Sequence, residues 1–521
     1  MPLSAELARK TTLDKDLDKL VQVEEAAGVI SRGLVAPGLA LLFIAFVAAV
    51  ATVYVSGEPG AVVIIAAAAI GGYLALNIGA NDVANNVSAA VGSRALTLGS
   101  ALIMAAIFEA AGALLAGGDV VKTISKGIID PALVGDPTVF VRLMLGALIS
   151  SALWINLATW VGAPVSTTHS VVGGVLGAGV AAAGFAAVDW SVMTAIAASW
   201  VVSPVAGGVI AAGFLFFIKS TMIYQDDKIA AARRWVPILI GIMGGAFTAY
   251  LVSKGLSHLF RPSGMGTAAL AVASTLAFWA VARRFVARQS VGMENRNQSL
   301  RKLFKFPLVV SAAILSFAHG ANDVANAVGP LSAIVSAVRS GSVSAEVGIP
   351  LWVMLIGAAG ISIGLFLFGP KLIRMVGEQI TKLNPMRAFC VALSAALTVI
   401  VASGFGLPVS STHIAVGAVF GVGFFREWYT ANSSRRRIYL ERKMERGRAE
   451  RESIGTAVVS VLADEAALDG DPRHPVSRDE ITRRNLVRRT HVRTIVAAWV
   501  TTVPASALLA AAVFYLIGLV W

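Results

Sequence analysis

The chain has 521 residues, of which 56% are hydrophobic and only 14% are charged. A soluble protein carries about a quarter charged residues, so this composition excludes an ordinary soluble domain and predicts a polytopic helical membrane protein. The net charge of +13 would suit nucleic acid. However, the basic residues lie between apolar runs, as in the cytoplasmic loops of membrane proteins, so we expect no nucleic-acid partner. The single cysteine, Cys390, excludes an intramolecular disulfide.

The apolar runs, taken in chain order, predict an all-α protein with about 10 to 12 membrane-spanning helices. The runs lie at 34–55, 61–80, 98–117, 138–163, 190–218, 235–253, 265–282, 306–320, 347–369, 386–407 and 493–519. We expect seven regions: an amphipathic cytoplasmic segment at 1–33, an extra helix at 34–60, a first transport repeat at 61–218, a linker with two helices at 219–303, a second repeat at 304–425, a basic cytoplasmic loop at 426–492 and the last helix at 493–521.

Two nearly identical polar stretches each end a long apolar run. Residues 79–86 read Gly-Ala-Asn-Asp-Val-Ala-Asn-Asn, and residues 320–327 read Gly-Ala-Asn-Asp-Val-Ala-Asn-Ala. Carboxylates inside a membrane are costly unless a site uses them, whereas asparagines alone could simply bond helices together. Amide and carboxylate oxygens can hold Na⁺, a carboxylate can carry a proton, and amide NH₂ groups can donate to an anion. The candidates are Asp82, Asp323, Asn81, Asn85, Asn322 and Asn326.

Two further stretches predict helices that begin abruptly inside the membrane, each as half of a re-entrant hairpin. Residues 164–169 read Pro-Val-Ser-Thr-Thr-His, and residues 408–413 read Pro-Val-Ser-Ser-Thr-His. Hydroxyls and free backbone amides at a helix start suit a tetrahedral anion, while the alternative is simple helix capping. The substrate-binding candidates are Ser166, Thr167, Thr168, Ser410, Ser411 and Thr412, and we expect His169 and His413 chiefly to orient the hairpins.

The order of these features repeats, which indicates an internal duplication. The spacings agree, because 322 − 81 = 241 for the asparagines and 413 − 169 = 244 for the histidines. The connection near 185–190 contains only one charge, Asp189, whereas the equivalent connection is the basic segment 426–492. Basic loops prefer the cytoplasm, so equivalent loops lie on opposite sides and the repeats are inverted, with a substrate site near the midplane between broken helices. We expect the N-terminus and 426–492 inside and the C-terminus outside.

Two polar residues break the internal symmetry. Glu109 lies in an apolar run where the second half has Ile361 nearby, and His319 stands where the first half has Ile78. Glu109 is a candidate for the coupling ion, although a protonated, hydrogen-bonded structural glutamate is an alternative reading. His319 is a candidate for tuning.

One pattern resembles the nucleophile elbow of hydrolases. Residues 360–364 read Gly-Ile-Ser-Ile-Gly. The elbow requires a strand, a turn and a helix, and this stretch lies in an apolar helical run. Small residues there favour close helix packing, so we expect no enzyme. The basic loop at 426–492 is expected to be helical or partly disordered, and the sequence alone gives no support for a regulatory or lipid-binding role.

The doubled Gly-Ala-Asn-Asp-Val-Ala-Asn and Pro-Val-Ser-Thr/Ser-Thr-His motifs resemble those of the inorganic phosphate transporter family over nearly all of 61–425 and the last helix. The resemblance implies an inverted-repeat secondary transporter, often a homodimer, that moves phosphate with Na⁺ or H⁺. It implies that Asp82, Asp323 and their asparagines help bind the coupling ion and substrate, that the Ser/Thr runs surround the anion, and that Glu109 matches a family acid. Met144 and Ala392 stand where sodium-coupled relatives carry polar residues, which leaves the coupling ion open.

These inferences predict a secondary transporter that imports inorganic phosphate by cation symport across the cytoplasmic membrane. The coupling ion would be a transported Na⁺ or H⁺, and we expect no cofactor and no resident metal. A sulfate or other oxyanion permease of the same fold is the nearest alternative, since some family members are sulfate permeases. A passive channel and a membrane-embedded hydrolase using Ser362 are alternatives from other classes.

Overall fold

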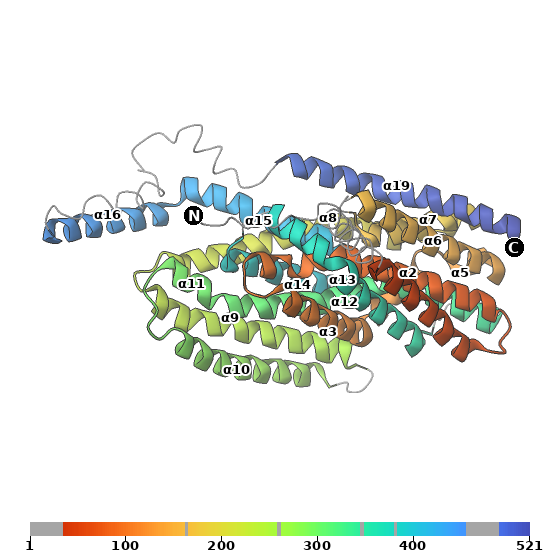
Figure 1. Cartoon of the computed structure of the whole chain (residues 1–521), viewed down its shortest axis with the longest axis horizontal. Helices are drawn as coiled ribbons and strands as arrows, with labels where there is room; N and C mark the ends of the chain where they lie inside the picture. The colour runs from red at the N-terminus through yellow and green to blue at the C-terminus, as the bar shows by residue number, and fades with distance from the viewer. Residues whose placement is uncertain (1–34, 162–164, 258–261, 344–347, 380–382, 455–488) are drawn as a thin grey trace, which may run out of the picture.

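The computed structural model describes residues 35–161, 165–257, 262–343, 348–379, 383–454 and 489–521 (Figure 1). Within these ranges, eleven helices are long and apolar enough to cross a membrane, in agreement with the sequence. They are Val35–Val55, α2 (Ala61–Gly92), α3 (Leu98–Ala116), α6 (Pro137–Val161), α8 (Trp190–Ile218), α9 (Lys228–Tyr250), α10 (Gly264–Gln289), α12 (Lys305–Ser340), α13 (Leu351–Gln379), α14 (Pro385–Gly404) and α19 (Arg489–Val520). The protein is therefore a multi-pass helical membrane protein.

Shorter elements complete the bundle. They are α4 (Gly118–Lys122), the π-helix η1 (Thr123–Gly127), α5 (Pro131–Val134), α7 (Thr167–Ala183), the π-helix η3 (Lys219–Ile223), α11 (Asn297–Leu303), α15 (Ser411–Asn432) and α16 (Ser434–Ile454). The first part of the basic loop is thus helical, which was one of the two structures expected for it. Helix α16 projects away from the bundle in Figure 1. The expected N-terminal helix at 1–33 and the loop residues 455–488 lie outside the described residues.

The two central helices extend beyond the apolar runs that the sequence shows. Helix α2 continues through its stretch to Gly92, and α12 continues through its own to Ser340. The carboxylates do not break the helices because Asp82 and Asp323 are buried and find hydroxyl partners on other elements. Side-chain bonding therefore satisfies the polar groups while the helical backbone continues.

The two hairpins form as predicted. Helix α6 packs on α7, and α14 packs on α15. Both short helices begin at a serine: Ser166 accepts a hydrogen bond from the amide of His169 at 3.1 Å, and Ser410 accepts one from the amide of His413 at 3.3 Å. With only 17 residues, α7 is too short to cross a bilayer at a rise of about 1.5 Å per residue.

The equivalent helices α2 and α12 pack on each other in opposite directions. Gly60, at the start of α2, lies against Val338 near the end of α12, and Gly71 lies against Leu331. A two-fold axis that exchanges two antiparallel helices is perpendicular to both helix axes. The two repeats are therefore inverted with respect to each other, as the loop charges predicted.

The repeats also exchange their neighbouring helices in matching register. Helix α13 packs on α2, and α3 packs on α12. Gly79 of α2 lies against the backbone of Ile361, and Gly320 of α12 lies against the backbone of Glu109. A side chain at either glycine would clash with that backbone. The matched contacts establish Ile361 as the structural counterpart of Glu109.

The hairpins and the last helices of the two repeats are exchanged in the same way. Helix α7 packs on α19, and α15 packs on α8. The linker helices α9 and α10 pack on each other along one edge of the bundle, on the side away from α19 (Figure 1). The interior is thus formed by α2, α12, α3, α13 and the two hairpins, which position the polar stretches at the centre.

Candidate functional site

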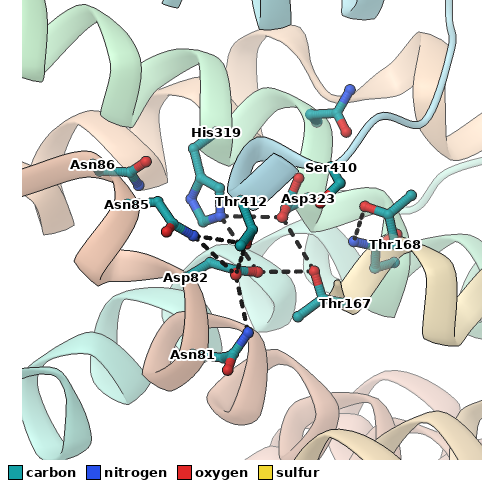
Figure 2. A network of polar contacts seen from close by, with 12 residues as sticks. Asn81, Asp82, Asn85, Asn86, Thr167, Thr168, His319, Asp323, Ser410 and Thr412 are labelled. Carbon is teal, nitrogen blue, oxygen red and sulfur yellow. Dashed lines mark hydrogen bonds and ion pairs between the residues drawn. The ribbon is translucent and has the colours of Figure 1, made fainter. Parts of the chain in front are cut away.

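The polar stretches of both repeats meet in one buried network (Figure 2). Helices α2 and α12 contribute Asp82 and Asp323, and the first turns of α7 and α15 contribute Thr167 and Thr412. Each of the two carboxylates is only 1% exposed. Residues separated by more than 300 positions therefore share a single site, at the place where the antiparallel helices cross and the hairpin tips meet.

Asp82 accepts hydrogen bonds from both repeats. The hydroxyl of Thr167 donates to Oδ2 at 2.8 Å, and the hydroxyl of Thr412 donates to Oδ1 at 2.9 Å. The amides of Asn81 and Asn85 donate to Oδ1 at 3.0 Å and 3.3 Å. Asp82 therefore links the tips of the two hairpins through its two carboxylate oxygens.

Asp323 and His319 complete the centre of the network. Oδ2 of Asp323 accepts from the Thr167 hydroxyl at 3.3 Å and lies 3.1 Å from Nε2 of His319. The same imidazole nitrogen lies 3.9 Å from Oδ2 of Asp82. One ligand atom from each of Asp82, His319 and Asp323 lies within 4.8 Å of the others. These atoms are close enough together for one small cation to reach all three.

The outer asparagines form a reciprocal pair of contacts between the repeats. Asn85 of the first repeat donates to the Thr412 hydroxyl at 2.8 Å, and Asn326 of the second donates to the Thr168 hydroxyl at 3.3 Å. Each amide thus holds the hairpin of the opposite repeat.

The inner asparagines instead hold the hairpin of their own repeat. The Asn81 amide donates to the carbonyl of Val165 at 3.1 Å. The Asn322 amide donates to the carbonyl of Leu407 at 3.1 Å, and its side-chain oxygen accepts from the amide of Val409 at 3.2 Å. The four asparagines therefore tie each hairpin tip to both repeats.

The six hydroxyl residues that were grouped as substrate-binding candidates have different hydrogen-bond partners. Ser166 and Ser410 cap their helices, and Thr168 donates to the carbonyl of Val409 at 3.0 Å. Thr167 and Thr412 are the two that donate to the carboxylates. Ser411 is buried beside them. Helix capping thus accounts for the serines at 166 and 410, and it does not account for the two threonines that face the network.

Asn86, Glu109 and His319 form what we call the polar flank of the site. The Asn86 amide donates to Oε1 of Glu109 at 2.7 Å, and Nδ1 of His319 lies 3.2 Å from the same oxygen. All three side chains are buried. His319 therefore lies between Glu109 and the two aspartates. Sequence reasoning did not select Asn86 as a site residue; its signal was that it is the one position at which the two eight-residue stretches differ, with Ala327 as its counterpart.

The internal two-fold relates the polar flank to Ala327, Ile361 and Ile78, which we call the apolar flank. All three of these residues are buried, and Ile78 and Ile361 belong to one hydrophobic cluster. Both repeats therefore supply an aspartate and a threonine to the centre of the site, which we call the shared centre, whereas the two flanks differ in chemistry.

The network contains an excess of buried acids. Asp82, Asp323 and Glu109 share one imidazole, that of His319. Within the described residues, Oδ1 of Asp323 and Oε2 of Glu109 are buried without a hydrogen-bond partner. Three ionised carboxylates in a low-dielectric interior cost far more than one imidazolium can offset, so protons or cations must balance them. Carboxylate, amide and hydroxyl oxygens suit a hard cation.

The two histidines of the hairpins lie next to each other, and His169 stacks on Trp200. The ring centroid of His169 lies 3.7 Å from that of Trp200 and 4.5 Å from that of His413. Trp200 donates from its indole nitrogen to the carbonyl of Pro408 at 3.1 Å. This packing is compatible with the predicted orienting role, which stays a prediction.

Ser362, of the elbow-like pattern, lies within α13 and donates to the carbonyl of Ala106 at 3.2 Å. Its neighbours Gly360 and Gly364 lie against α2 at Ala75 and Leu76. The pattern therefore occurs in a continuous helix and serves close packing between α13 and α2.

These features define the class of protein: a helical membrane protein in which two inverted repeats enclose a buried carboxylate and hydroxyl site, the architecture of secondary transporters. Residues 78–510 match the model of the phosphate transporter family. The chain is 43% identical over 528 residues to a protein of Helicobacter pylori named as a phosphate permease, covering 97% of this chain and 99% of the relative. The chain therefore belongs to the phosphate transporter family.

Two further comparisons agree. A protein of Pyrococcus abyssi, also named as a phosphate permease, is 37% identical over 365 residues, which cover 69% of this chain and 88% of the relative. A solved structure described as a sodium-dependent phosphate transporter matches with a TM-score of 0.73 and 33% identity, and covers 88% of this chain and 100% of that chain.

Proposed function

We propose that the chain imports inorganic phosphate across the cytoplasmic membrane by symport with Na⁺ or H⁺. The observation that carries this proposal is the single buried network in which Asp82 and Asp323, from inverted repeats, share the hydroxyl of Thr167. Membership of the phosphate transporter family supports phosphate as the substrate.

The anion would bind between the first turns of α7 and α15. These turns present free backbone amides and the positive ends of two helix dipoles from opposite repeats, which favour a tetrahedral anion. The hydroxyls of Thr167 and Thr412 now donate to Asp82. A cation bound at the aspartates would compete for these carboxylate oxygens and release the hydroxyls to turn towards phosphate. Cation binding would thereby promote anion binding, as symport requires.

The coupling cation would bind at the aspartates and the polar flank. The oxygens of Asp82 and Asp323 can accept Na⁺ or a proton, and His319 can pass a proton between them and Glu109 because it lies near all three. The similarity to a sodium-dependent transporter favours Na⁺. The buried side chains of Met144 and Ala392 supply no oxygen for a sodium ion.

Alternating access would follow from motion of the two inverted repeats about the shared network. The hairpin tips are held to both repeats by asparagine side chains, so these contacts would rearrange as the repeats move. The loop charges support a topology with the N-terminus and the 426–492 loop inside and the C-terminus outside.

Uptake by purified protein in vesicles tests the proposal. Labelled phosphate uptake is measured with the Na⁺ gradient and the pH gradient varied separately. We expect saturable uptake that responds to one of the two gradients. Absence of saturable uptake under both gradients contradicts the proposal, and flux that neither saturates nor follows a gradient identifies a channel. Stronger competition by sulfate than by unlabelled phosphate would identify an oxyanion permease of other specificity.

A further inference from the structure

A second group of charged side chains lies away from the aspartates, where η3, the start of α14, the end of α15 and the start of α16 come together. We call Lys219, Arg387, Arg426 and Arg436 the basic cluster. The Lys219 side chain is only 7% exposed. Arg387, Arg426 and Arg436 are each partly buried. A buried lysine is uncommon in proteins and calls for a partner of opposite charge.

The described contacts of Lys219 are with aromatic rings. Its Nζ lies 4.4 Å from the ring centroid of Tyr429 and 5.7 Å from that of Phe425. Among the described residues, no carboxylate forms an ion pair with Lys219. The face of an aromatic ring attracts a cation through its quadrupole, which is a weaker partner than a carboxylate. The ammonium group is therefore only partly compensated.

The neighbours of Lys219 add positive charge. Arg426, Arg436 and Arg387 lie close enough to repel its ammonium group. Arg387 is in turn repelled by Arg426 and by Arg301 of α11. Glu427 is the acid that attracts Arg426. In the described part of the chain, the cations around Lys219 therefore outnumber the carboxylate that attracts them.

The guanidinium groups retain donors for a further ligand. Arg436 donates from Nη1 to the carbonyl of Thr430 at 3.4 Å. The adjacent Arg435 donates from Nη1 to the carbonyl of Ser220 at 3.5 Å. Both bonds are long and use one nitrogen each, whereas a guanidinium group carries five N–H donors. The planar fork of arginine fits the oxygens of a phosphate group.

We propose that the basic cluster binds a phosphate-bearing anion, at a site distinct from the one formed by Asp82 and Asp323. Repulsion among several partly buried cations destabilises the fold. A bound anion with two or three oxygens reverses the sign of this interaction. The anion is either the headgroup of an acidic phospholipid or a free phosphate ion. Both present the same oxygens, and basic groups at the ends of spanning helices lie at headgroup level.

Thermal unfolding of the purified full-length protein in a neutral detergent tests the proposal. Short-chain phosphatidylglycerol and inorganic phosphate are titrated separately, with phosphatidylcholine and sodium chloride at equal ionic strength as controls. We expect at least one of the two phosphate-bearing probes to raise the unfolding temperature by about 3 °C beyond its control. No shift with either probe overturns the proposal.

Variants locate the binding. In a Thr167→Val background, which removes the transport-site contribution to a phosphate-induced shift, Arg426→Gln and Lys219→Met should each abolish the shift, whereas Lys122→Gln, which removes an exposed cation from α4, should retain it. Without any anion, Lys219→Met should unfold at the same or a higher temperature than the wild type, because it relieves repulsion; this separates loss of binding from misfolding. In the Thr167→Val background, a shift that survives both cluster variants overturns the proposal.

A Thr167→Val background separates this site from the transport site. A phosphate-induced shift that persists in Thr167→Val and disappears on adding Arg426→Gln identifies free phosphate as the ligand of the cluster. A phosphatidylglycerol shift alone identifies lipid. A phosphate shift lost in Thr167→Val, with no lipid effect, assigns the anion to the transport site and overturns the proposal. Uptake assays are not needed here, so failure of this proposal and failure of phosphate transport are distinguishable.

Discussion

The polar flank and the apolar flank occupy positions that the internal two-fold exchanges, and they have opposite chemistry. In both, a glycine of the central helix lies against the backbone of the facing helix, Gly320 at Glu109 and Gly79 at Ile361. The backbone packing is therefore the same. What differs is the set of side chains: an amide, a carboxylate and an imidazole on one side, and alanine and two isoleucines on the other.

This difference shows that duplication can preserve a scaffold while only one copy carries an extra ionisable group. The threonines and aspartates that both repeats supply would bind the substrate and a cation. The polar flank, which one side alone supplies, is suited to a further step such as proton movement or the setting of the coupling ratio. The following changes either remove the shared centre, remove one flank or perturb the other.

Neutralising the shared centre should have the largest effect. Asp82→Asn removes the charge from both bonds and replaces one carboxylate oxygen by an NH₂ group, which confronts the hydroxyl of Thr167 or that of Thr412 according to the orientation of the amide. Loss of two charge-assisted bonds, at about 1.5 to 3 kcal/mol each, should lower gradient-driven phosphate uptake by about 100-fold or more. Initial uptake rates in vesicles measure this. Asp323→Asn should have a comparable effect; if either variant keeps wild-type uptake, the shared network is not the transport site.

Neutralising the polar flank should have a smaller and different effect. Glu109→Gln keeps the shape and the contact with the Asn86 amide while it removes the charge beside His319. We expect gradient-driven uptake to fall about 10-fold, because one charge interaction is lost. Exchange of internal for external phosphate, which needs no net cation movement, should be retained. Equal losses in uptake and exchange would contradict a coupling role for this flank.

The two threonines that face Asp82 should differ from each other. Thr167 donates to both aspartates, whereas Thr412 donates to Asp82 alone among the carboxylates. Thr167→Val should therefore lower uptake several-fold more than Thr412→Val, because the single O–H of Thr167 is shared between the two aspartates and its loss, at about 1 kcal/mol or more, affects both carboxylates. Thr159→Val on α6, whose hydroxyl donates to its own helix at the carbonyl of Ile155, serves as the control. Equal effects of the two site variants would show that the contact of Thr167 with both aspartates does not contribute to transport.

Perturbing the apolar flank should have the smallest effect on transport. Ile361→Val changes the counterpart of Glu109 and removes one methylene from a buried position. We expect the stability to fall by about 1 kcal/mol and the dependence of uptake on the Na⁺ and pH gradients to remain unchanged. Thermal unfolding and gradient-dependent uptake provide the two readouts. A changed ion dependence would mean that both flanks act in coupling.

Much of the site could be predicted because the polar stretches are duplicated in an apolar background. Asp82 and Asp323 were selected from their cost in a membrane, and the structure places them together. The partner of each hydroxyl could not be predicted from its position in the sequence. Of three adjacent residues, Ser166 caps its helix, Thr167 donates to a carboxylate and Thr168 donates to a carbonyl. Asn86 was missed as a site residue because its partner Glu109 lies on another helix.

The sequence by itself determined the helical membrane architecture, the duplication and the inversion, because hydropathy, repeated motifs and loop charge are properties of the chain read in order. It also marked the symmetry-breaking pair, Glu109 and His319. Only the tertiary structure decided that α2 and α12 pass unbroken through their polar stretches and that His319 lies between Glu109 and both aspartates. It alone assembled the basic cluster around Lys219. The physical reason is that the cost of burying a charge depends on partners from distant segments, and only the folded chain brings those partners within reach.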